Sequence, residues 1–436
     1  MPVVNGPDRT MEVRSESQRV VRRAAFAIYA VAVIVRATLI FGFARYEIGR
    51  PEPVRVALSL ARNGTFSDPY TIPTGPTAHV APLYPLMIAP IYRTLGDTET
   101  ADRVRMGMSI LVGAAEYALL PCVSASLGMG ALAGAAAGFA GAAVPLHYWV
   151  DSIGEFETAW AAIFLELTTI WFSRWLRAAR FSARGGAVAG LWAGAGMLLS
   201  PSLLPVLGGF GALAIAAGQA GRKAGALRAG AGCVLAAVAV VSPWTIRNRH
   251  VMGGWVPIRD NLGIELAISN CDGARPDIES SRLVEAIQPR HPGWTAEGAA
   301  VLKRKGELAF EREAKSEAVA WIRTHPIEFA RLTASRIRNF WFPASLPWPN
   351  SLGIWAISAA AAFGLFGLWR GNRFAAGVLA IPLVTYPAIF YVIKNGLRYQ
   401  HPIAWVLLLL AAWLAVRGRP GRGPGAAGTD GTVCDS

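Results

Sequence analysis

Long apolar runs separated by short polar segments dominate the chain. The first run covers residues 21–43 and follows Arg19. A helix needs about 20 residues to cross a bilayer, so this run predicts a transmembrane helix. Later apolar runs predict further spans at residues 104–127, 131–149, 156–175, 187–199, 203–217, 227–244, 352–369, 374–393 and 402–416. The pattern therefore predicts an all-α polytopic membrane protein with about ten transmembrane helices.

The polar break after the first run, residues 44–103, is expected to be an outer loop with two interfacial helices. Residues 53–62 form an amphipathic pattern and residues 80–92 an apolar, proline-rich one that is short for a span. The apolar side chains of the first pattern share one helical face: Val54, Ala57, Leu58 and Ala61. With both helices on the surface, residues 21–246 contain a module of seven spans.

Residues 247–350 are more polar and are expected to form a small mixed outer domain. Short strands are predicted at residues 255–258 and 264–268, and helices at residues 295–324 and 326–342. Three C-terminal spans follow within residues 351–416. Short cytoplasmic tails are expected at both ends, residues 1–20 and the Gly/Pro/Arg-rich residues 417–436, the second of them disordered.

Composition supports a membrane protein and excludes a nucleic-acid partner. The 436 residues are 53% hydrophobic and only 16% charged, against about 25% charged in soluble domains. The formal charge of +14 comes from arginines that flank apolar runs, as the positive-inside rule requires. The strongest arginine clusters then fall on one side. We expect a multi-pass protein of the cell (inner or plasma) membrane, with residues 44–103 and 247–350 on the extracytoplasmic side.

Acidic side chains near the predicted outer surface are the first candidates for chemistry. Glu47 comes about one turn after the first span, where an interfacial position would raise its pKa and suit a general base. Asp151 and Glu155 follow a later span and form a possible second acidic site. His147 precedes them at helical spacing, but Pro145 and nearby glycine favour a loop. No cofactor is predicted and a divalent metal is not indicated.

Cationic and aromatic groups on the same side are candidates for binding a phosphate. A basic group beside an apolar helix end has two interpretations, an interfacial anchor or a phosphate ligand at headgroup depth. The candidates are Arg50, His79, Tyr84, Arg247, Arg259, Arg398, Tyr399 and His401.

Ionisable groups also interrupt the predicted spans. Arg36 lies about two turns from the end of the first span, where it either snorkels to the surface or faces the bundle. Glu116 and Glu166 are expected to face the bundle interior, because acids in spans are costly towards lipid.

Several sequence segments resemble membrane glycosyltransferases of the C fold (GT-C), the superfamily of protein O-mannosyltransferases and the lipid A aminoarabinose transferase. The resemblance covers about residues 20–416 and rests on the order of elements and on the segments YEIGR, TGPTAHVAPLYP, PWTIRNRHVMGGWVPIRDNLGIEL, THPIEFARLTASRIRNFW and LRYQHPI. It implies that Glu47 is the catalytic base and that Asp151 and Glu155 match a second acidic region. The family's lysine before the proline of Pro82-Leu83-Tyr84 is absent here, and His79 is the nearest polar group.

The resemblance implies an inverting transferase that moves a sugar from a polyprenyl-phosphate donor to an acceptor glycan, lipid or protein. The alternative is a transporter or flippase of a lipid-linked or anionic substrate, with Arg36, Glu116 and Glu166 along its path. A non-catalytic membrane subunit with the same fold is a third hypothesis.

Overall fold

The computed structural model describes residues 7–43, 49–144, 154–178, 182–217, 223–285, 287–344 and 348–417. Within these ranges the chain is mostly helical and contains no strand, only two isolated bridges. The prediction of an all-α protein is confirmed, and the two predicted strands are wrong. Residues 264–268 lie instead in α11 (Leu262–Ser269), most of which is buried against α14 (Glu307–Thr324). A short apolar run has no period that distinguishes a buried helix from a strand.

Six helices in the described part of the chain are long and apolar enough to cross a membrane. Their spanning portions are Gln18–Gly42, Glu99–Ser126, Gly225–Met252, Trp348–Gly371, Arg373–Val392 and Leu397–Arg417. Two shorter apolar helices, Ala131–Ala143 and Pro201–Ala216, accompany them. The structure thus confirms a multi-pass helical protein, while the total of about ten spans remains a prediction.

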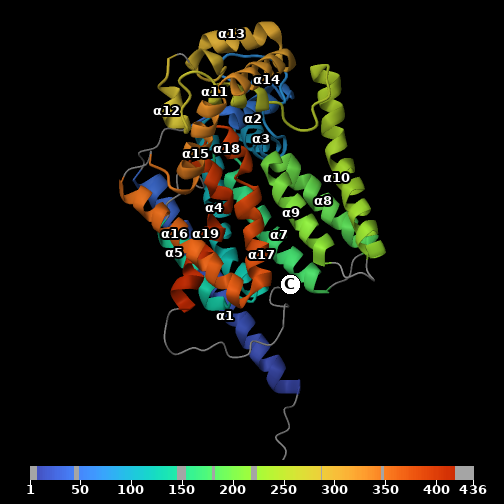
Figure 1. The fold of residues 1–436 in the computed structure, drawn as a ribbon, viewed down its shortest axis with the longest axis vertical. Coiled ribbons are helices and arrows are strands. Elements are labelled where there is room, and N and C mark those ends of the chain that lie inside the picture. The colour runs from blue at the N-terminus through green and yellow to red at the C-terminus, as the bar shows by residue number, and fades with distance from the viewer. Residues whose placement is uncertain are drawn as a thin grey trace, which may run out of the picture.

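The bundle is built around α4 (Glu99–Ser126) and α19 (Leu397–Arg417). Helix α4 packs on α1 (Pro7–Ala37), α5 (Ala131–Ala143) and α7 (Thr158–Ala178), and α19 packs on α5, α7 and α16 (Trp348–Gly371) (Figure 1). Near the end of α1, Arg36 is fully buried and donates to the carbonyls of Gly141 (3.3 Å) and Ala142 (3.4 Å). Arg36 therefore faces the bundle, and the snorkelling interpretation is wrong.

Close backbone contact joins α8 (Ala183–Leu199) to α10 (Lys223–Met252), a pair beside α9 (Leu204–Ala217) in Figure 1. A Cβ added to Gly186 would lie 1.9 Å from the carbonyl oxygen of Ala229, and one added to Gly190 would lie 2.1 Å from that of Cys233. Glycines four residues apart form one helical face, and their small size allows two apolar helices to approach within van der Waals contact.

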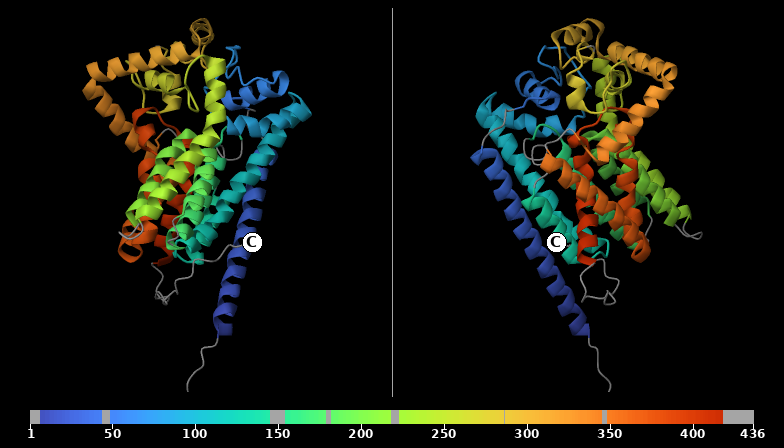
Figure 2. Two further views of the ribbon diagram at one scale, coloured as in Figure 1. Left: turned by 90° about the vertical axis from the view of Figure 1, so that its right-hand side faces the viewer. Right: turned by 60° about the vertical axis from the view of Figure 1, so that its left-hand side comes forward.

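Shorter helices and loops cover one end of the bundle, at the top of Figure 1 and in both views of Figure 2. They are α2 (Glu52–Asn63), α3 (Leu83–Leu95), α11, α12 (Ile278–Arg282), η4 (Gln288–Arg290), α13 (Ala296–Lys305), α14 and α15 (Pro326–Trp341). The helix predicted at residues 295–324 is divided at Gly306, whose φ of 80° ends α13. The remaining helices of the bundle are η1 (Thr38–Gly42), η2 (Pro201–Leu203), α17 (Arg373–Thr385) and α18 (Ala388–Val392).

The amphipathic helix expected at residues 53–62 is confirmed as α2, but its apolar face is covered by protein. Val54, Ala57 and Leu58 are buried in one cluster with Tyr84 and Ile88 of α3. The amphipathic pattern therefore reflects packing of α2 on α3, and both helices lie at the end of the bundle that the shorter helices cover.

The glycine contact between α8 and α10 predicts the effect of a single substitution. Replacing Gly190 with leucine should destabilise the protein by about 1–3 kcal/mol, because the side chain collides with the backbone at Cys233. Gly208 of α9 has no atom within 4 Å of an added Cβ, so Gly208→Leu is the matched control. Thermal unfolding of purified protein in detergent measures both. Equal stability of the two variants would contradict this packing.

Candidate active site

Two of the three acids predicted to carry chemistry, Glu47 and Asp151, lie outside the residues that the structure describes, whereas Glu155 lies within them. The described chain resumes at Gly49 and at Gly154. The site is therefore built here from the segments that directly follow each acid and from the side chains that hold them.

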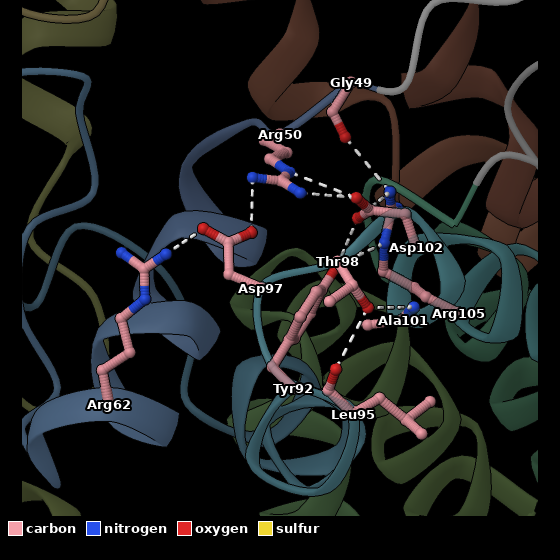
Figure 3. A network of polar contacts seen from close by, with 10 residues as sticks. All are labelled: Gly49, Arg50, Arg62, Tyr92, Leu95, Asp97, Thr98, Ala101, Asp102 and Arg105. Atoms are coloured by element: carbon pink, nitrogen blue, oxygen red, sulfur yellow. Dashed lines mark hydrogen bonds and ion pairs between the residues drawn. The ribbon is translucent and has the colours of Figure 1, made fainter.

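Both segments meet at one side chain of α4. Arg105 is fully buried and donates from Nη2 to the carbonyl of Gly49 (3.1 Å) and from Nη1 to the carbonyl of Gly154 (2.5 Å). Its Nε donates to the hydroxyl of Tyr92 (2.9 Å), and its Nη2 also lies 3.4 Å from Asp102 (Figure 3). The parts of the chain that follow Glu47 and Asp151 are thus brought together at the head of α4.

Arg50 belongs to the same network and faces carboxylates. Its Nη2 lies 2.7 Å from Asp102, which is buried, and its Nη1 lies 2.6 Å from Asp97 (Figure 3). Asp97 also pairs with Arg62 at the end of α2. These contacts connect Arg50 to the start of α4. They also occupy the guanidinium N–H groups expected to bind phosphate.

Glu155 lies against the segment that follows Glu47. A Cβ added to Gly49 would be 1.5 Å from Oε1 of Glu155, so this carboxylate lies directly against the Cα of Gly49. Burial raises the pKa of Glu155, and the nearby charges of Arg105 and Arg398 oppose that shift. The neighbouring Gly154 carbonyl also accepts a hydrogen bond from Tyr84 (2.5 Å). The Tyr84 hydroxyl therefore donates to the backbone and helps to position Gly154.

Among the described residues, Arg398 forms an ion pair with no carboxylate and hydrogen-bonds no backbone carbonyl. Its guanidinium lies over the rings of Phe156 (4.1 Å) and Tyr399 (4.8 Å) and donates to the Tyr399 hydroxyl (2.8 Å). Its Nε is buried and has no hydrogen-bond partner among the described residues. A guanidinium held between two rings near the Gly49–Glu155 contact retains the capacity to bind an anion.

Two basic residues of this region were not among the predicted site residues. The buried Lys394 pairs with Glu265 (2.6 Å), and although burial opposes ionisation, this lysine lowers the pKa of Glu265 to about 2. Arg282 of α12 acts electrostatically on Glu155, as Arg398 does. Lys394 follows a predicted span, a position that could have marked it. Arg282 lies in a stretch without periodicity, where no signal was available.

The imidazole of His79 is neutral and buried. Its Nδ1 lies 3.0 Å from the Tyr70 hydroxyl, and burial, assisted by the charge of Arg259, lowers the pKa of His79 to about 3. Arg259 donates to the His79 carbonyl (2.7 Å), and Arg247 donates to the carbonyls of Thr77 (2.8 Å) and Phe66 (2.7 Å). These three residues therefore hold the segment between α2 and α3, and their hydrogen bonds are to protein groups.

His401 lies within the bundle. It is fully buried and its Nε2 is 3.0 Å from Oε2 of Glu116 on α4. Glu116 and Glu166 are both fully buried, which confirms that these acids face the interior. Among the described residues, no group of three His, Cys, Asp or Glu side chains could hold a metal ion.

No protein-family model matches the chain, and no curated protein sequence matches it. One solved structure with a similar fold is the archaeal oligosaccharyltransferase AglB from Archaeoglobus fulgidus, in complex with an inhibitory peptide and a dolichol-phosphate. The TM-score is 0.53 at 15% identity, over 90% of this chain and 50% of AglB. The chain thus spans about half the length of that neighbour. The likeness shows a shared fold and is consistent with the GT-C resemblance.

A buried acid of α14 anchors the loop that His79 occupies. Glu307 accepts hydrogen bonds from the backbone N–H of Ala78 (2.7 Å) and the hydroxyl of Thr77 (2.5 Å). Burial raises the pKa of Glu307 to about 7. A raised pKa in the folded state favours the protonated form, so its contribution to stability is complete below pH 4.5 and is lost as the pH rises through 7.

Glu307→Gln should therefore change the pH dependence of unfolding. A shift from 4.5 to about 7 corresponds to about 3 kcal/mol. Thermal unfolding should show equal stability of both proteins at pH 4.5, and a more stable variant at pH 8. Glu313→Gln removes an exposed carboxylate of the same helix and serves as control. A stability difference that is the same at both pH values would refute the assignment.

Proposed function

We propose that the protein is an inverting glycosyltransferase that moves a sugar from a polyprenyl-phosphate donor to an acceptor at the outer face of the membrane. The fold shared with an oligosaccharyltransferase supports glycosyl transfer as the class of reaction. The acceptor is a glycan, a lipid or a protein, each of which presents a nucleophilic group at that face.

Arg398 is the observation that carries the proposal. The Arg398 side chain is half-buried, and its Nε is buried without a hydrogen-bond partner among the described residues. A charge that is partly desolvated favours a partner of opposite sign, because its desolvation is otherwise uncompensated. Lys394 has Glu265 and Arg50 has two aspartates, but no carboxylate forms an ion pair with Arg398 within the described residues. The phosphate of a lipid-linked donor supplies the missing anion and can accept two parallel hydrogen bonds from a guanidinium. Arg398 stands at the start of α19, where a lipid tail would run beside the bundle.

In the proposed reaction Glu47 is the base. Its carboxylate removes the proton from an acceptor hydroxyl as that oxygen attacks the anomeric carbon. The bond between the anomeric carbon and the phosphate oxygen breaks, and the lipid phosphate leaves with the electron pair. Attack from the face opposite the leaving group inverts the configuration. A phosphate leaves without a proton donor, so Arg398 stabilises its charge and no paired acid is needed.

The neighbouring groups then have supporting roles. Glu155 lies against Gly49, two residues after Glu47, and burial raises its pKa and so favours its neutral form. A neutral carboxyl there limits repulsion of both the base and the phosphate. Tyr399 orients Arg398 through its hydroxyl. Glu265 neutralises Lys394, so the net positive charge of the site is concentrated at Arg398.

A transporter or flippase of a lipid-linked or anionic substrate is the second candidate. The observation that favours it is the buried group of Glu116, Glu166 and His401 within the bundle, where both carboxylate oxygens of Glu166 have no partner among the described residues. Movement of a fluorescent polyprenyl phosphate across proteoliposomes, without sugar transfer, would favour transport over catalysis.

Substitution of Glu47 and Arg398 separates chemistry from donor binding. We expect Glu47→Gln to lower kcat by about 10²–10⁴, because general-base catalysis contributes that factor. Arg398→Met should raise the KM for the donor by about 10–100-fold, the range for a lost hydrogen bond to a charged group. The assay is transfer from a panel of radiolabelled polyprenyl-phosphate hexoses and pentoses in membranes.

Arg417→Met is the matched control for Arg398. Arg417 lies at the other end of α19 and also contacts an aromatic ring, that of Trp413 at 4.9 Å. Its loss should leave both kinetic constants unchanged. Full transfer by Glu47→Gln, or an equal effect of the two arginine variants, would contradict the assigned roles.

A further inference from the structure

We propose that Arg105 is a positioning residue that fixes the separation of Gly49 and Gly154, the first described residues after Glu47 and Asp151. Its guanidinium binds the Gly49 carbonyl from one terminal nitrogen and the Gly154 carbonyl from the other. The catalytic consequence of this clamp rests on the proposed function, but the clamp itself does not.

The chemistry of the guanidinium explains why an arginine occupies this position. Its donors form a rigid planar fork, so two acceptors bound at different nitrogens are held at a fixed separation. A lysine ammonium is a single point on a flexible stem and cannot hold both carbonyls in the same way. Gly49 and Gly154 are far apart in sequence, and Arg105 is the described side chain that hydrogen-bonds both of their carbonyls.

The guanidinium is itself held in place. Its Nε donates to Tyr92, whose hydroxyl donates to Asp102 (2.7 Å), and Asp102 lies one helical turn from Arg105 on α4 (Figure 3). Arg50 binds the same aspartate and follows Gly49 in the chain. The loop after Glu47 is therefore attached to α4 at two consecutive residues. The hydrogen bonds to Tyr92, Asp102 and the two glycine carbonyls together fix the orientation of the Arg105 guanidinium.

The other loop has a second attachment. The Gly154 carbonyl accepts from both Arg105 and the Tyr84 hydroxyl of α3. Just beyond it, the Glu155 carboxylate lies against Gly49 with no space for a side chain between them. A change in the fork would therefore alter the separation of Gly49 from Gly154 and Glu155, and a shift of about 1 Å in catalytic groups costs about 100-fold in rate.

Three variants test the clamp. Arg105→Lys keeps the positive charge but removes the planar set of guanidinium donors, and Arg105→Met removes both. Tyr84→Phe removes only the second bond to Gly154, so it remains informative if a variant at the buried arginine fails to fold. Arg103→Met is the matched control, because Arg103 lies on the same helix and pairs only with the exposed Glu99.

The first measurement is hydrogen exchange by mass spectrometry on protein in lipid nanodiscs, which does not depend on activity. We expect faster exchange in both peptides, the one with Gly49 and the one with Gly154, for the Arg105 variants. Tyr84→Phe should affect only the second peptide, and Arg103→Met neither. Unchanged exchange in either loop of Arg105→Lys would overturn the proposal.

The second measurement is transfer from the same panel of polyprenyl-phosphate sugars. Arg105→Lys should lower kcat by about 10–100-fold with the donor KM within about twofold, since the Arg398 site is untouched. A raised KM with unchanged kcat would overturn the positioning role. If the exchange results are as expected and the native protein transfers no sugar, the clamp stands and the proposed function fails.

Discussion

A buried guanidinium that must satisfy its donors is the constraint on which the site depends. Arg105 lies near the start of α4 and is fully buried, so water cannot serve as its partner there. Two backbone carbonyls of the outer loops, at Gly49 and Gly154, meet that requirement. The stability of the bundle and the geometry of the loops are therefore linked, because neither loop can move away without leaving a buried charge unsatisfied.

Buried and half-buried polar groups of other segments also satisfy their hydrogen bonds with the backbone between α2 and α3. Glu307 of α14 and the side chains of Arg247 and Arg259 hold the backbone of the first outer loop. Nearly every buried cation described above is thus matched to a carbonyl or a carboxylate. Arg398 is the exception among the described residues, and the proposed phosphate would complete the pattern. This one unmatched charge, within a fold shared with an oligosaccharyltransferase, supports the proposed function.

Elements with long periodic patterns could be predicted from the sequence. The conformation of short apolar runs and the partners of ionisable side chains could not, because they depend on tertiary contacts. Long apolar runs and the amphipathic face of α2 fixed most helices in advance. The α11 residues predicted as a strand gave no usable period. The surroundings of Arg36 and His79 could not be predicted, because one sequence does not show which side chains or carbonyls will surround an ionisable group. The unmatched state of Arg398 depends on contacts between distant segments, so only the structure reveals it.

The central claim is that a lipid phosphate binds beside Arg398. A cryo-EM structure of the protein in nanodiscs with a polyprenyl phosphate tests it most directly. We predict density for the phosphate within hydrogen-bond distance of the Arg398 guanidinium, on the side facing Gly49 and Glu155. Phosphate density inside the bundle near Glu166, with Arg398 unoccupied, would contradict the account and favour transport.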